Sequence, residues 1–180
     1  KALQESKPLD IEMIAPSHGI IWRTHAAKII KQYSDWVSNA PEKKAVIIYD
    51  TMWKSTETIA YTLLDTFEEK GYKTIFMNLQ DNHISDVITE VLSSEYVCVG
   101  SPTLNNNIMP NVAAFLTYLK GLSPKKRKAI AFGSYGWSGQ SVGQVEEYLK
   151  ECSFEVIDTV RLQYVPDIKD LDEAKLRIME

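Results

Sequence analysis

Short apolar runs alternate with amphipathic helical stretches along most of this chain, and this alternation restricts the possible folds more than any other feature of the sequence. Five runs have the length and apolar content of strands, namely residues 45–49, 74–77, 96–100, 129–133 and 155–160. The helical stretches that follow them are residues 57–70, 84–92, 109–119, 141–150 and 171–179. Apolar strands separated by helices predict an α/β fold in which helices cover both faces of a parallel sheet.

The helical stretches carry apolar residues at three- and four-residue steps, as the sequence of Ile59, Leu63 and Phe67 illustrates. This spacing places one apolar stripe of each helix against the sheet. Gly71 follows the first of these stretches and Pro110 opens the third, which matches the glycine that ends many helices and the proline that begins them. We therefore expect a doubly wound, five-stranded parallel sheet, for which 2-1-3-4-5 is a common strand order.

Length and charge limit the classes of function. With 180 residues and 44% hydrophobic residues, the chain can bury one substantial core. Its formal net charge of −4 argues against nucleic-acid binding. We predict that the basic run at residues 125–128 is a solvated loop before a strand, or else a docking spot for an acidic electron donor.

Cysteine usage and hydropathy bear on the compartment. Cys98 lies in an apolar run, Cys152 follows a helical stretch, and the sequence has no Cys-x-x-Cys pair. This usage is typical of a reducing compartment without disulfides or a cysteine-ligated metal. No apolar run approaches the ~20 residues that span a bilayer, and no signal stretch opens the chain. We expect a cytoplasmic protein that does not enter a membrane.

The first forty residues do not fit the repeating pattern. Residues 11–15 are a short apolar run, residues 16–19 predict a turn, and residues 26–37 carry a helical stripe that ends at an Asn-Ala-Pro linker. One strand and one helix cannot form a core, so they pack on the main domain or are the tail of a preceding one. We expect a boundary between residues 1–40 and 41–180. The opening residue, Lys1 rather than Met, further predicts a processed product or a fragment of a longer protein.

The junction between the first strand and its helix is rich in hydroxyl groups. A strand end beside a helix N-terminus offers free N–H groups and the positive end of the helix dipole, so it can hold a phosphate without arginine. The junction lacks the glycines and Gly-Lys-Ser/Thr ending of a nucleoside triphosphate loop and the Gly-x-Gly-x-x-Gly of dinucleotide folds. We predict a site for the phosphate of flavin mononucleotide (FMN); an ordinary hydroxyl-capped helix is the alternative. The predicted cofactor-binding residues here are Thr51, Met52, Trp53, Lys54, Ser55 and Thr56.

The loops after the third and fourth strands should meet this junction at the carboxyl ends of the strands, where the cofactor lies in sheets of this order. An isoalloxazine ring needs a flat apolar face and a polar rim, which aromatic side chains and loop amides provide. In the first loop the predicted cofactor-binding residues are Ser101, Pro102, Thr103, Leu104, Asn105 and Asn106. In the second they are Ser134, Tyr135, Gly136, Trp137, Ser138 and Gly139.

The side chains of these loops suggest separate roles. Tyr135 and Trp137 are candidates for stacking on the ring, and Asn105 and Asn106 for bonding its edge. Each has a plainer interpretation, because asparagine favours turns and tryptophan is often a partly buried core residue. Trp53 would contribute either its ring or its backbone N–H.

All three loops resemble those of flavodiiron proteins (A-type flavoproteins). That family carries similar Tyr-Asp-(Ser/Thr)-Met-Trp-x-Ser-Thr-Glu, Ser-Pro-Thr-x-Asn-Asn and Ser-Tyr-Gly-Trp-Ser-Gly runs around its flavin, in this order. The resemblance implies a flavodoxin-like domain for residues 41–180. It also implies a noncovalent FMN that accepts electrons from a rubredoxin, a flavin reductase or a reduced deazaflavin.

The N-terminal segment resembles another part of the same family. Residues 15–22, Ala-Pro-Ser-His-Gly-Ile-Ile-Trp, look like the end of its metallo-β-lactamase-like domain, in which the histidine, here His18, ligates one iron of a diiron centre. Without the resemblance, a lone histidine in a turn is more simply a surface residue. The His-x-(His/Glu)-x-Asp-His cluster of that site is absent, so we expect FMN without the diiron centre in this chain.

The resemblance implies that the parent protein is a homodimeric oxidoreductase that reduces dioxygen to water or nitric oxide to nitrous oxide. No residue of this chain is expected to act as a catalytic acid, base or nucleophile. Two alternatives remain open at this stage. One is a stand-alone flavodoxin-type electron carrier, which would not need residues 1–40, and the other is a flavodoxin-like NAD(P)H:quinone reductase.

Overall fold

The computed structural model describes residues 9–122 and 124–179. It contains two compact units, the first ending at Ala40 and the second beginning at Pro41. Each unit is described by itself.

The second unit is built on a parallel sheet with the strand order β2-β1-β3-β4-β5. The strands are β1 (Glu42–Tyr49), β2 (Lys73–Asn78), β3 (Ser94–Gly100), β4 (Lys128–Tyr135) and β5 (Glu155–Gln163). The predicted strand order is confirmed. Because helices connect successive strands, the carboxyl ends of all five strands lie at one edge of the sheet.

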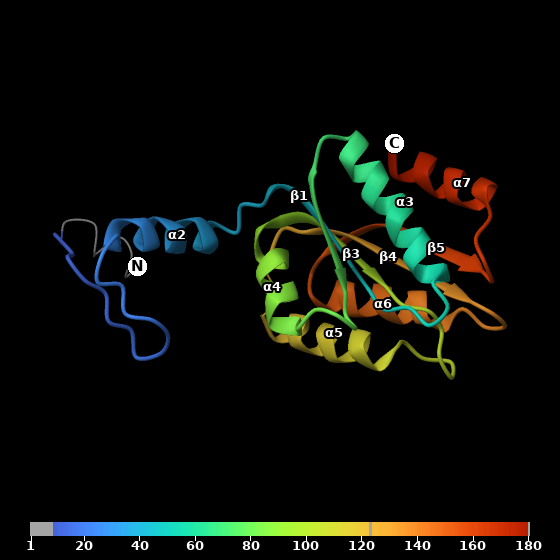
Figure 1. The fold of residues 1–180 in the computed structure, drawn as a ribbon, viewed down its shortest axis with the longest axis horizontal. Helices are drawn as coiled ribbons and strands as arrows, with labels where there is room; N and C mark the ends of the chain where they lie inside the picture. The colour runs from blue at the N-terminus through green and yellow to red at the C-terminus, as the bar shows by residue number, and fades with distance from the viewer. Residues whose placement is uncertain (1–8, 123, 180) are drawn as a thin grey trace. The chain divides into compact units, whose positions relative to one another are not determined.

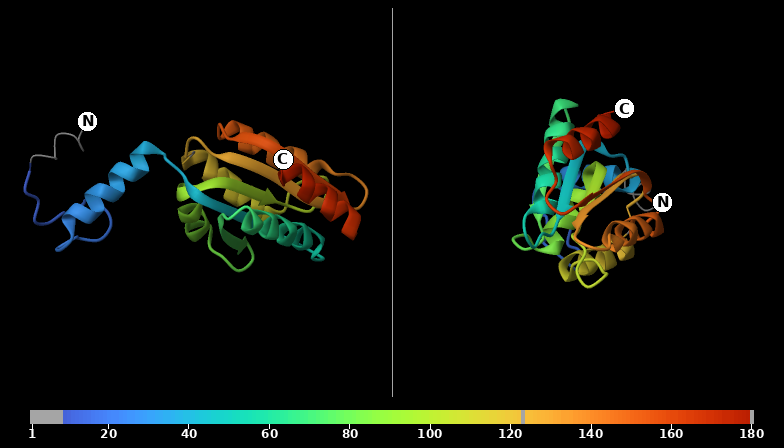
Figure 2. Two further views of the ribbon diagram at one scale, coloured as in Figure 1. Left: turned by 90° about the horizontal axis from the view of Figure 1, so that it is seen from above. Right: turned by 90° about the vertical axis from the view of Figure 1, so that its right-hand side faces the viewer.

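Helices cover both faces of the sheet because the inner strands are apolar on both sides (Figures 1 and 2). Val46 and Ile48 of β1 pack in the core beneath α4 (Ile84–Ser93), α5 (Pro110–Leu122) and α6 (Gln140–Glu151). Ala45 and Ile47 pack in the core beneath α3 (Ser55–Glu69) and α7 (Ile168–Met179). The predicted α/β class with two covered faces is confirmed.

The ends of the helices follow their local sequence. Gly71, two residues beyond the end of α3, takes φ +72°. Its N–H donates to Glu68 O at 2.8 Å, and the N–H of Tyr72 donates to Phe67 O at 3.0 Å. These two bonds satisfy carbonyls that the helix end leaves free. Pro110 is the first residue of α5, where its missing N–H costs nothing.

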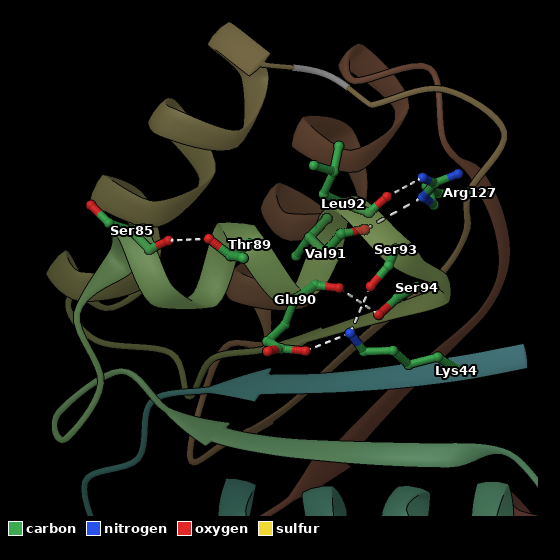
Figure 3. Close-up of polar contacts among 9 residues, drawn as sticks. All are labelled: Lys44, Ser85, Thr89, Glu90, Val91, Leu92, Ser93, Ser94 and Arg127. Carbon is green, nitrogen blue, oxygen red and sulfur yellow. Dashed lines mark hydrogen bonds and ion pairs between the residues drawn. The ribbon is translucent and has the colours of Figure 1, made fainter. Parts of the chain in front are cut away.

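Helix α4 passes into β3 without a loop, since α4 ends at Ser93 and β3 begins at Ser94. Figure 3 shows how the carbonyls at the end of α4 are satisfied. The Arg127 guanidinium donates from Nε to Val91 O at 3.4 Å and from Nη2 to Leu92 O at 2.5 Å. A cation at this position also complements the negative end of the helix dipole.

The prediction that residues 125–128 form a solvated loop is wrong for Arg127, which is only 1% exposed. Its guanidinium is buried because the carbonyls of α4 provide acceptors there. Lys44 of β1 is buried beside it, where its ammonium pairs with Glu90 and donates to Ser93 Oγ at 2.7 Å (Figure 3). The basic side chains thus join α4 to the sheet at the end away from the strands' carboxyl edge.

The described residues of the first unit form a closed turn and helix α2 (Ala26–Ser38). Reciprocal backbone bonds of 3.0 and 2.9 Å join Ile14 and Trp22 and close the turn. The strand expected at residues 11–15 is therefore wrong, because only Ile14 pairs and it pairs with a single residue. Of the expected helical stripe, Ala26 and Ile29 of α2 are buried, whereas Tyr33, Trp36 and Val37 are exposed.

None of the described helices combines the length and apolar character that crossing a lipid bilayer requires.

Candidate functional site

A cavity of about 250 Å³ lies at the carboxyl edge of the sheet. The loops after β1, β3 and β4 come together there, at the right-hand side of the sheet in Figure 1. Most of the walls are apolar or aromatic, as expected for a site that takes a flat ring. The lining residues are Met52, Trp53, Ser55, Pro102, Thr103, Ser134, Tyr135, Gly136, Tyr164 and Val165.

The β1–α3 junction leaves its hydrogen-bond donors free. Lys54 takes the left-handed conformation, φ 67°, directly before α3 begins at Ser55. The first bond of the helix is Thr58 N to Lys54 O at 2.9 Å, and no side chain caps the helix. Within the described parts of the chain, no group accepts a hydrogen bond from the N–H groups of residues 52–57. Free N–H groups around a left-handed residue form an anion-binding concavity at the positive end of the helix.

A buried hydroxyl supports a ligand at this junction. Thr51 Oγ1 is buried and has no hydrogen-bond partner among the described residues. A buried hydroxyl without a partner is costly, and such groups are usually satisfied by protein, water or ligand. A phosphate oxygen would satisfy it. The residues present at the junction thus fit the phosphate of FMN.

Asp50 holds the junction in place, a role that the sequence analysis missed. It is fully buried, and its Oδ1 accepts from Thr51 N–H at 2.7 Å and from Gln80 Nε2 at 2.6 Å. Its Oδ2 accepts from Asn111 Nδ2 at 3.0 Å. Gln80 Nε2 also donates to Thr51 O at 2.7 Å. Gln80 and Asn111 lie 30 and 61 residues further along the chain, so the local sequence around Asp50 carries no signal for these contacts.

Tyr49 ends β1 and contacts the first turn of α3. Its hydroxyl donates to Glu57 Oε1 at 2.9 Å. Burial, and then this hydrogen bond to a carboxylate, raise the pKa of Tyr49 well above its ordinary value. The phenol therefore stays protonated and keeps Glu57 fixed beside the junction.

The N-terminal end of α6 is occupied by the loop after β3. Thr103 Oγ1 accepts from Ser141 N–H at 3.3 Å and donates to Ser141 Oγ at 2.9 Å. Ser141 Oγ in turn donates to Ser101 O at 3.0 Å. The hydroxyl of Thr103 is thereby used within the protein. Of α3 and α6, α3 is thus the helix whose first N–H groups and neighbouring hydroxyl lack a partner among the described residues.

Two further contacts hold the loops against one another. The hydroxyls of Thr56 and Ser134 lie 2.9 Å apart, which joins α3 to the end of β4. Gly133 lets the loop after β3 approach β4, because a Cβ at this position would lie 2.0 Å from the carbonyl oxygen of Ser101. Ser134 and Tyr135 belong to β4 rather than to a loop as expected, since they pair with Leu162 and Gln163 of β5.

Asn105 and Asn106 form a tight turn. Both have positive φ, 49° and 61°, and Leu104 and Asn107 exchange backbone bonds of 2.8 and 2.9 Å around them. Asparagine tolerates this conformation, so turn formation accounts for both residues. The turn is held to the next loop by Ser138 Oγ, which donates to Asn106 Oδ1 at 2.9 Å. Contact of either asparagine with a flavin stays a prediction.

The aromatic candidates are placed differently. Trp137 is 95% exposed and Trp53 is 88% exposed, so neither is a core tryptophan. Trp53 and Tyr135 line the cavity, whereas Trp137 lies outside its lining. Large exposed aromatic side chains around an apolar cavity are typical of a binding surface.

The structure brings eight of the predicted residues into the cavity lining and places the others around it. Those outside the lining are Thr51, Lys54, Thr56, Ser101, Leu104, Asn105, Asn106, Trp137, Ser138 and Gly139. Two lining residues, Tyr164 and Val165, were not predicted. They directly follow β5, and the rule that ligands bind at the carboxyl ends of strands was the signal that could have found them.

His18 lies in the exposed turn of the first unit, beside Gly19 with φ +100°. In the described parts of the chain, no three His, Cys, Asp or Glu side chains gather closely enough to hold a metal ion. A role for His18 as an iron ligand stays a prediction.

A doubly wound parallel sheet with an open helix N-terminus beside an aromatic cavity is an arrangement typical of proteins that bind a phosphorylated ring cofactor. The comparisons with known proteins agree with this class. The family model described as flavodoxin matches residues 47–176, so the chain belongs to the flavodoxin family.

Individual relatives confirm the resemblance to flavodiiron proteins. A nitric oxide reductase of Moorella thermoacetica is 44% identical over 168 residues, which are 92% of this chain and 42% of that protein. The rubredoxin oxygen:oxidoreductase structure of Desulfovibrio gigas matches with a TM-score of 0.91 and 35% identity, over 98% of this chain and 45% of that one. A flavodiiron protein of Giardia intestinalis matches with a TM-score of 0.90 and 30% identity, over 99% of this chain and 45% of that one. The chain spans less than half the length of these relatives.

Proposed function

We propose that this chain binds FMN noncovalently and is the electron-transfer part of a flavodiiron oxidoreductase. The observation that carries the proposal is the open N-terminus of α3, with the unpartnered Thr51 hydroxyl, at the edge of an aromatic cavity. FMN supplies one- and two-electron redox chemistry when it is bound.

The chain's own residues bind and orient the cofactor. The N–H groups of residues 52–57 and the hydroxyls of Thr51 and Ser55 hold the phosphate, and the helix dipole of α3 favours its charge. Asp50 keeps the loop in its binding conformation through the Thr51 N–H. Trp53 and Tyr135, which line the cavity, would stack on the ring, and Trp137, which lies outside the lining, is a further stacking candidate.

The parent reaction is the reduction of dioxygen to water, of nitric oxide to nitrous oxide, or both. The domain carries electrons from a donor such as a rubredoxin, a flavin reductase or a reduced deazaflavin to a diiron site. In this proposal residues 1–40 are the end of a metallo-β-lactamase-like domain, His18 is one iron ligand in the parent protein, and the parent is a cytoplasmic homodimer. The names of the relatives, a nitric oxide reductase and rubredoxin-oxygen oxidoreductases, support the two reactions and a rubredoxin donor.

Flavin titration tests the proposal. Purified protein is added to FMN, riboflavin and FAD, and quenching of flavin fluorescence is followed. We expect FMN to bind at least about tenfold more tightly than riboflavin, because a charged hydrogen-bonded phosphate contributes roughly 1.5–3 kcal/mol. Absence of binding, or equal affinity for riboflavin, would contradict the phosphate site. Reduction of the bound flavin by NAD(P)H without a partner enzyme would instead favour a quinone reductase.

A further inference from the structure

A fourth segment, the junction between β5 and α7, reaches the cavity. Tyr164, the first residue after β5, has φ 57° and is 59% exposed. The left-handed region is unfavourable for a bulky residue with a Cβ, so this conformation needs a compensating interaction. The Tyr164 N–H provides one, because it donates to Tyr135 O at 2.7 Å. The bond continues the pairing of β5 with β4 by one residue and ties Tyr164 to a predicted cofactor residue.

The same segment fixes the backbone opposite the Tyr164 ring. Gln163 Nε2 donates to Gly136 O at 2.8 Å. A Cβ at Gly136 would lie 3.9 Å from Tyr164 Cε1, so the ring stands directly beside this glycine. Tyr164 and Gly136 both line the cavity, together with Val165. The exposed tyrosine therefore presents its ring to the cavity rather than to open solvent alone.

The position of Tyr164 in the sheet indicates which part of a ligand it would meet. The phosphate-binding junction follows β1, and Tyr164 follows β5, with β3 and β4 between them. Three strand spacings of about 4.8 Å separate the two by roughly 14 Å. An elongated ligand whose phosphate lies at α3 would therefore bring its ring system, and not its phosphate, toward Tyr164.

We propose that Tyr164 is a cofactor-binding residue whose ring forms the β5 side of the isoalloxazine site. This inference rests on the proposed binding of FMN. The left-handed backbone at Tyr164 places the ring there. The hydrogen bonds from Tyr164 N–H to Tyr135 O and from Gln163 Nε2 to Gly136 O hold the end of β5 against the end of β4.

Titrations with FMN and riboflavin test this assignment, because both carry the ring and only one carries the phosphate. Replacing Tyr164 by Ala should weaken both ligands by the same factor, about tenfold, as expected when an aromatic contact is lost. Tyr164→Phe should stay within about twofold of the wild type, since it keeps the ring. Tyr164→Asn tolerates the left-handed backbone and should match the Ala variant. Tyr118→Ala, an exposed tyrosine of α5, is the control that should change neither affinity.

The outcomes separate the two proposals. Wild-type protein that binds no FMN would contradict the proposed function. Wild-type protein that binds FMN while Tyr164→Ala and Tyr164→Asn retain its affinity would overturn the assignment of Tyr164 alone. Loss of FMN affinity without loss of riboflavin affinity would also overturn it, because the residue would then act on the phosphate. Thermal unfolding of each variant shows whether a loss of affinity comes from a damaged fold.

Discussion

Helices α3 and α6 begin at the same edge of the sheet, and both follow a loop with hydroxyl-bearing residues, yet their N-termini differ. The first turn of α3 carries N–H groups without partners in the described structure, beside an unpartnered threonine hydroxyl. At α6 the corresponding threonine comes from another loop, and Thr103 bonds both the N–H and the hydroxyl of Ser141. A helix N-terminus at the ligand-binding edge is therefore a ligand site only where the protein has not already filled it.

The largest expected effect comes from adding the same charge to both helices. Ser55→Asp places a carboxylate at the first residue of α3, where it would repel a phosphate with about 4 kcal/mol at 4 Å and an effective dielectric constant of 20. We expect FMN affinity to fall at least about a hundredfold while riboflavin affinity changes much less. Gln140→Asp, at the first residue of α6, is the matched control and should leave FMN affinity nearly unchanged. Equal losses in the two variants would remove the distinction between the helices.

A second substitution tests the N-terminus of α6, which Thr103 occupies. Thr103→Val keeps the shape of the side chain and removes its hydrogen bonds to Ser141, so it leaves a buried N–H without a partner. We expect the free energy of unfolding to fall by about 2 kcal/mol. Urea unfolding of the flavin-free protein measures this change. An unchanged free energy of unfolding would show that the hydrogen bonds between Thr103 and Ser141 do not stabilise the N-terminus of α6.

The corresponding substitution beside the N-terminus of α3 should have the opposite effect on stability. Thr51→Val removes a hydroxyl that has no partner, so the flavin-free protein should keep its stability or gain up to about 1 kcal/mol. FMN affinity should fall about tenfold, because one hydrogen bond to the phosphate is lost. Unfolding and FMN titration of the same variant measure the two effects. A stability loss as large as that of Thr103→Val would mean that the hydroxyl already has a partner in solution.

The smallest expected effect is the pH dependence of stability that Tyr49, beside the N-terminus of α3, introduces. Burial and the bond to Glu57 raise the pKa of Tyr49, so the folded protein holds this proton more tightly than the unfolded chain, whose tyrosines titrate near pH 10. The unfolded chain therefore loses the proton first, and the free energy of unfolding should decline as pH rises above about 10. Tyr49→Phe should show a shallower decline. Urea midpoints of both proteins at about pH 8, 10 and 11 would measure it, and parallel declines would argue against a raised pKa.

Periodicity was enough to predict the strands, the helices and the two covered faces of the sheet in the second unit. Each apolar run became a strand and each amphipathic stretch a helix, because alternate faces of the inner strands are buried beneath helices. The ends of the elements were harder to predict. Strand β1 begins at Glu42, three residues before the apolar run, because polar residues can also pair in a sheet. Burial of Lys44 and Arg127 depends on partners in α4 that lie far along the sequence.

The site could be predicted only where its chemistry is local. The three loops that converge at the cavity contain recognisable runs of hydroxyl, small and aromatic residues. Asp50 and Tyr164 lack such a signal, because their roles arise from contacts with α5, from the loop after β2 and from the end of β4. The difference between the N-termini of α3 and α6 could not be predicted from the sequence either. Both involve a threonine, and the sequence does not show whether its hydroxyl is already hydrogen-bonded.

The direct passage from α4 into β3 makes that end of the sheet intolerant of added residues. An insertion between Ser93 and Ser94 would separate the carbonyls of α4 from the buried Arg127 guanidinium, which would then lose two of its acceptors. The opposite edge is built from loops, which accept changes in length more readily. Among related domains, insertions and deletions are therefore expected in the loops at the cofactor site. Such changes can alter the site while the sheet and helices stay unchanged.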